Sequence, residues 1–74
     1  LAEYEELIRR LYEAISSLPP MQARRVHARY MLGMKVKDIA AMEGITPSQA
    51  GKSIHAALRR LRRYFARQKW TVNL

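Results

Sequence analysis

The fold is decided by the stretch Ile39-Ala40-Ala41-Met42-Glu43-Gly44-Ile45-Thr46-Pro47-Ser48-Gln49-Ala50. Gly44 supplies the left-handed backbone that ends one helix. Thr46 can cap the next helix, because Pro47 suits its first position and Gln49 completes a capping box at its third. The small residue Ala40 allows the two helices to cross closely, and Ala50 and Ile54 fill the angle between them. This pattern indicates a helix-turn-helix, whose second helix presents its outer face to a DNA major groove.

The spacing of apolar residues predicts an all-α domain of four helices, at about 3–16, 20–32, 36–43 and 47–67. We expect one domain over 1–74, with the helix-turn-helix at about 36–66, in a chain that can be a fragment of a longer protein. Pro20 starts the second helix and Gly33 stops it. The expected inward residues are Tyr4, Leu7, Ile8, Leu11, Ile15 and Leu18 of the first helix, Val26, Tyr30 and Met31 of the second, and Ile39, Ala40 and Met42 of the third.

The fourth helix divides into two faces. Its core stripe comprises Ala50, Ile54, Ala57, Leu58, Leu61 and Phe65. The opposite face carries Ser48, Lys52, His55, Arg59, Arg62 and Arg63, so it is polar at the start and cationic afterwards. In a helix-turn-helix the first part of this helix meets base edges, and the flanking cations meet phosphates.

Charge and composition narrow the class of partner. The 74 residues carry a net charge of +8, and from residue 44 onward there are seven basic residues and no acidic one. A C-terminal half with this charge favours a polyanionic binding partner. The simplest such partner is nucleic acid, and an anionic membrane surface is the alternative. The chain has no cysteine and no apolar run near the length of a membrane span, so we expect a cytoplasmic protein.

Enzymatic chemistry and cofactors are not expected. No paired carboxylates or activated nucleophile are visible. His27 and His55 are far apart without a carboxylate at ligand spacing, which argues against a metal site. Gly51-Lys52-Ser53 matches the end of a phosphate-binding loop, but position 46 is threonine where that motif needs glycine. We expect His27, Tyr64 and Trp70 to serve packing.

Several segments together resemble region 4 of the bacterial sigma-70 family of RNA polymerase sigma factors. They are 18–26, 30–34, 38–46 and 53–62, which read LPPMQARRV, YMLGM, DIAAMEGIT and SIHAALRRLR. The resemblance covers about residues 4–66. It implies a four-helix domain that reads a promoter −35 element and docks on the flap of the polymerase β subunit. A small variant of this kind fits a phage or mobile-element regulator as well as a bacterial one.

The resemblance places the family's base-reading positions on Pro47, Ser48, Gly51 and Lys52. With the helix start and the outward histidine, the full expected base-reading set is Thr46, Pro47, Ser48, Gln49, Gly51, Lys52 and His55. The expected phosphate contacts are Lys35, Lys37, Arg59, Arg62 and Arg63. We expect a monomer on double-stranded DNA. The alternatives are a dimeric helix-turn-helix repressor or activator of the LuxR or phage type, and a basic protein-interaction module.

Overall fold

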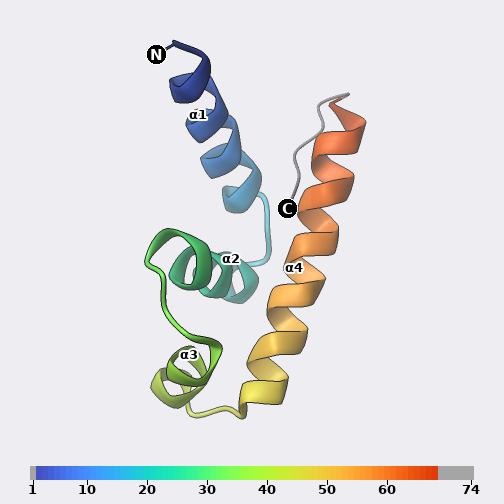
Figure 1. Ribbon diagram of the computed structural model, residues 1–74. Helices are drawn as coiled ribbons and strands as arrows, with labels where there is room; N and C mark the ends of the chain where they lie inside the picture. Colours follow the sequence, from blue (N-terminus) through green and yellow to red (C-terminus); the bar gives the residue numbers. More distant parts are fainter. Residues whose placement is uncertain (1, 69–74) are drawn as a thin grey trace.

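The computed structural model describes residues 2–68, and in this range all regular structure is helical (Figure 1). The elements are α1 (Ala2–Ser16), α2 (Pro20–Val26), the π-helical turn η1 (His27–Met31), α3 (Val36–Glu43) and α4 (Pro47–Arg67). The long α4 runs the length of the molecule, with α3 against its first half and α2 and α1 following toward its second half. The predicted all-α helix-turn-helix class is confirmed.

The turn between α3 and α4 has the predicted chemistry. Gly44 ends α3 with φ 68°. The Thr46 hydroxyl accepts from the Gln49 amide at 3.1 Å, and the Gln49 side chain accepts from the Thr46 amide at 2.9 Å. Both halves of the capping box are therefore formed, and Pro47 occupies the first turn as expected. The start of α4 is fixed locally, so the direction of its outer face is fixed too.

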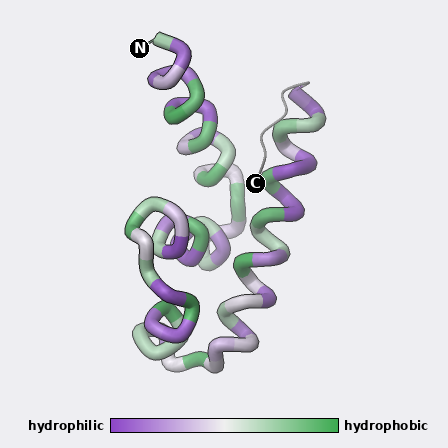
Figure 2. Tube along the Cα trace, viewed as in Figure 1, coloured by the Kyte–Doolittle hydropathy of each residue, from purple (hydrophilic) through white to green (hydrophobic). Residues whose placement is uncertain are grey.

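One apolar stripe of α4 forms the centre of the core. Five of its six predicted core residues are buried, and Leu58 is half-buried. Ala14, Ile15 and Leu18 pack on the stripe from the α1 side, and Val26 packs from α2. Figure 2 shows the resulting alternation of hydrophobic and hydrophilic residues along α4. Leu61 and Val26 are the largest fully buried side chains.

Two predicted inward positions are wrong on α1 and one is wrong on α3. Tyr4 is 63% exposed and Leu7 is also exposed, because α2 and α4 meet only the later part of α1, where Ala14 and Ile15 are buried. Met42 is 76% exposed. At 100° per residue Met42 lies about 160° around the helix from buried Ala40, although it is only about 60° from buried Ile39.

The second predicted helix also differs, because its last turn is π-helical. The Leu32 amide donates to the His27 carbonyl, five residues back, before Gly33 ends the turn at φ 69°. A π turn is wider than an α turn and changes the angular spacing of its side chains. Tyr30, predicted to be buried, is consequently 55% exposed, while Met31 stays partly buried against the core.

Candidate nucleic-acid interface

The outer face of α4 forms an open polar and cationic strip. Ser48, Lys52 and His55 are exposed along its first half, and the three arginines predicted to lie outward are exposed beyond them. Ser48, Gly51, Lys52, His55 and Arg59 together line a shallow hollow in this strip. The fold thus brings four predicted base-reading positions together with one predicted phosphate contact.

The other predicted base-reading residues lie at the start of α4. Thr46, Pro47 and Gln49 are exposed, but the polar atoms of Thr46 and Gln49 already hydrogen-bond to each other's backbone. Their first role is therefore to cap the helix. Ser48, Lys52 and His55 have no such bond among the described residues and keep their polar atoms available.

The predicted phosphate-binding cations have no carboxylate partner among the residues that the structure describes. Lys35 and Lys37 at the start of α3, and Arg59, Arg62 and Arg63 on α4, are exposed, and none forms an ion pair within residues 2–68. Asp38 is their acidic neighbour in α3. The unpaired positive charge is therefore concentrated on the helix-turn-helix, which favours a polyanionic ligand there.

Two carboxylates of α1 bind arginines of the same helix. Glu6 accepts from Arg9 and Arg10, and Glu13 accepts from Arg9, all within one helix. These bonds hold the pKa of the Glu6 carboxyl below its ordinary value. Glu6 and Glu13 are thus paired within that helix, and no ion pair joins them to α4 within residues 2–68.

Sequence reasoning missed a three-helix clamp centred on Arg25 of α2. Its guanidinium donates to the Glu43 carboxylate at 2.9, 3.0 and 3.1 Å, and its Nη1 donates to the Ser53 hydroxyl at 2.9 Å. The side chains of Arg25 and Glu43 are only 14% and 12% exposed. The clamp ties α2 to the last residue of α3 and to α4, and so holds the helix-turn-helix angle. A lone carboxylate directly before the turn glycine was its only sequence signal.

The clamp also sets the ionisation of Glu43. Hydrogen bonds from Arg25 are the main cause that lowers the pKa of this carboxyl, and burial opposes them. The carboxylate is therefore charged at neutral pH and remains paired. A second arginine acts similarly nearby, since Arg29 donates to the Met34 carbonyl at 3.0 Å and braces the loop before α3.

The aromatic side chains predicted to serve packing do so where the structure describes them. His27 is partly buried, with its ring centre 6.5 Å from that of Tyr12. Tyr64 packs edge-on against Phe65 at 5.5 Å and joins the core. Trp70 lies outside the described residues. Within residues 2–68, no three metal-binding side chains lie close enough to hold an ion, and no helix could cross a membrane.

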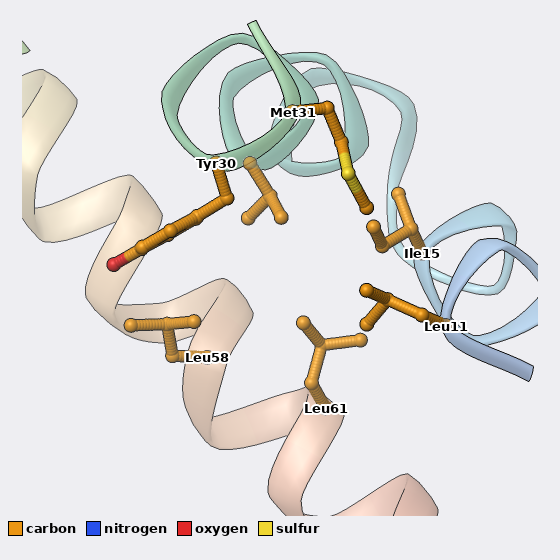
Figure 3. Close-up of a pocket in the computed structure, with 7 residues that line it drawn as sticks. Leu11, Ile15, Tyr30, Met31, Leu58 and Leu61 are labelled. Atoms are coloured by element: carbon orange, nitrogen blue, oxygen red, sulfur yellow. The ribbon is translucent and has the colours of Figure 1, made fainter. Parts of the chain in front are cut away.

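A second surface is apolar. Leu11 and Ile15 of α1, Val26, Tyr30 and Met31 of the second helical segment, and Leu58 and Leu61 of α4 line a groove between these elements. Figure 3 shows their side chains pointing into the same space, with the Tyr30 ring at one edge. The exposed Tyr4 and Leu7 extend the apolar character along α1.

Comparison with known families now adds to this geometry. Residues 8–61 match the family described as Sigma-70, region 4. The chain belongs to this family. The match spans the residues of the apolar groove, the clamp and the helix-turn-helix as far as Leu61, and it confirms the resemblance drawn from the sequence. No match was found among curated proteins or among solved structures. The region 4 domain described here is thus a DNA-binding domain of the sigma-factor type, which acts in transcription.

Proposed function

We propose that this region 4 domain reads a promoter −35-type element by placing the first half of α4 in the DNA major groove. The observation that carries the proposal is the uncompensated strip on the outer face of a capped α4. The first residues of a recognition helix contact base edges, and B-DNA presents a distinct pattern for each base pair there.

The proposed contacts follow from position along the helix. Ser48, Gly51, Lys52 and His55 face the base edges, while Thr46, Pro47 and Gln49 bring the start of α4 against the DNA. The phosphate contacts are Lys35, Lys37, Arg59, Arg62 and Arg63. Such cations set affinity and register, and the base-facing side chains set sequence preference.

The second proposed contact is with RNA polymerase, on the flap of its β subunit. Two features support this contact, the apolar groove of Figure 3 and the exposed apolar residues of α1. Both leave hydrophobic side chains open to a partner protein. A domain that docks on polymerase as a monomer acts in the cytoplasm of a bacterium, whether the gene is bacterial or phage-derived.

A dimeric repressor or activator is the second candidate function. Exposure of Tyr4, Leu7 and Tyr12 on α1 favours it, since a second copy could cover these side chains. Sedimentation of the purified domain separates the two. A stable dimer supports the repressor, and a monomer supports the sigma-like reading. Binding to anionic vesicles without binding to DNA would support the basic interaction module instead.

Selection of bound duplexes from a random pool, at two salt concentrations, tests the main proposal. A short asymmetric consensus is expected, and a palindrome would favour the dimeric candidate. Replacing Ser48 and Lys52 together by alanine should reduce sequence preference more than total affinity. Arg59→Ala should weaken all sequences alike and reduce the salt slope by about one unit. Equal behaviour of these two variants would contradict the proposed division of contacts.

A further inference from the structure

Gly51 is an unexplained glycine in the middle of the proposed DNA-facing surface. It lies inside α4, where glycine is about 1 kcal/mol less favourable than alanine. Its backbone is not left-handed, since the positive-φ glycines are Gly33 and Gly44. A Cβ added at Gly51 would meet no atom within 4 Å. Nothing in the free domain therefore requires glycine at this position.

Gly51 lies in the hollow on the outer face of α4 and presents no side chain there. Ser48 and His55 stand about one helical turn before and after Gly51 on the same strip. Lys52 and Arg59 complete the hollow, and both are cationic. A DNA group bound next to Gly51 would therefore have polar and positively charged side chains on both sides.

The chemistry of Gly51 limits which DNA group can sit there. Its amide lies inside the helical hydrogen-bond ladder, so the outward surface of the residue is its Cα. A base edge that needs a donor or acceptor finds none at that point. In the major groove the thymine C5-methyl is the apolar group among the base-edge features.

We propose that the hollow over Gly51 is a subsite for a thymine C5-methyl group, which makes Gly51 a specificity-determining residue. The inference rests on the proposed DNA-reading role of α4. Lys52 and His55 beside the hollow contact neighbouring polar base edges, and Arg59 contacts the flanking phosphate. Alanine at 51 would place its own methyl where the thymine methyl sits.

The test pairs one methyl group on the protein with one on the DNA. The wild-type domain first selects its consensus duplex, and each thymine in that duplex is then replaced singly by deoxyuridine, which lacks the methyl. At one position wild type should lose about three- to fivefold in affinity, the value of one buried methyl. Gly51→Ala should lose about tenfold on the thymine duplex. It should recover most of that loss on the deoxyuridine duplex, so that the preference between the two bases inverts.

Stability and a matched variant provide the controls. Gly51→Ala should raise the midpoint of thermal unfolding by about 4 to 8 °C, because the free domain gains helix propensity without a clash. Ala66→Gly changes helix propensity at an exposed position of α4 outside the hollow, and it should leave the thymine preference unchanged.

Four outcomes overturn the inference. They are a lowered unfolding midpoint in Gly51→Ala, an unchanged thymine preference in that variant, a uniform loss on all duplexes, and a wild type that binds DNA but selects no sequence. A uniform loss would assign the hollow to the phosphate backbone. Selection of no sequence by the wild type would also contradict the proposed promoter reading, as would the absence of any DNA binding. The other three outcomes leave that proposed function standing.

Discussion

The clamp between Arg25 and Glu43 makes the sharpest stability prediction. Arg25→Ala removes every hydrogen bond from the guanidinium to the Glu43 carboxylate and to the Ser53 hydroxyl. It leaves a carboxylate that is 12% exposed without its partner. The variant should therefore be destabilised even though the substitution touches no apolar core residue.

The magnitude follows from the burial of the pair. Exposed ion pairs contribute about 0 to 1 kcal/mol, and removal of one partner from a fully buried pair costs about 3 to 5 kcal/mol. At 14% and 12% exposure the pair lies nearer the buried limit, so we expect a loss of about 2 to 4 kcal/mol. A 74-residue domain has a total stability of about 4 to 11 kcal/mol. The loss should lower the unfolding midpoint by roughly 10 to 25 °C.

Thermal and urea unfolding followed by circular dichroism measure this loss. Arg9→Ala is the matched control, because Arg9 also forms ion pairs, with Glu6 and Glu13, but is 59% exposed. The unfolding midpoint of this variant should barely change. A double variant, Arg25→Met with Glu43→Leu, should regain most of the stability, since apolar replacement of both partners removes the unpaired charge. The clamp does not stabilise the fold if Arg25→Ala has the same unfolding midpoint as Arg9→Ala. The same conclusion follows if the double variant is no more stable than Arg25→Ala.

Three further predictions concern the turn and the pH response. Thr46→Ala should lose about 1 kcal/mol in urea unfolding through loss of the cap, whereas Thr46→Ser should keep nearly all stability. Gly44→Ala should be destabilised by about 1 to 2 kcal/mol because φ is 68° there, and an alanine variant as stable as wild type would disprove that strain. Arg25 lowers the pKa of Glu43 in the folded state. The ionised Glu43 carboxylate therefore contributes its full stabilisation above the ordinary glutamate pKa of about 4.3, and this stabilisation is lost as pH falls through the lower folded pKa. Wild type should therefore lose stability below about pH 4.3 more steeply than Glu43→Gln in a pH series of melts. Parallel curves would exclude the clamp as the cause.

The sequence by itself determined the parts of this domain that depend on near neighbours along the chain. The turn at Gly44, the capping box of Thr46 and Gln49, and the two faces of α4 all follow from residues within one or two helical turns. Local backbone preference and helical period fix such features before any tertiary contact forms. The predicted strip on α4 is accordingly exposed as expected, and the family match covers it as far as Arg59.

Only the tertiary structure decided which apolar residues are buried and which charges are paired. Tyr4 and Leu7 have the helical spacing of a core stripe, yet no described helix covers them, because the period of a helix does not reveal where its neighbour ends. Tyr30 lies outside the core because it belongs to a π turn, whose side chains have a different angular spacing from those of an α-helix. Arg25 and Glu43 are 18 residues apart, and Arg25 and Ser53 are 28 apart, so their meeting depends on how three helices cross. Contacts at such separations are set by packing geometry, which no local pattern in the chain encodes.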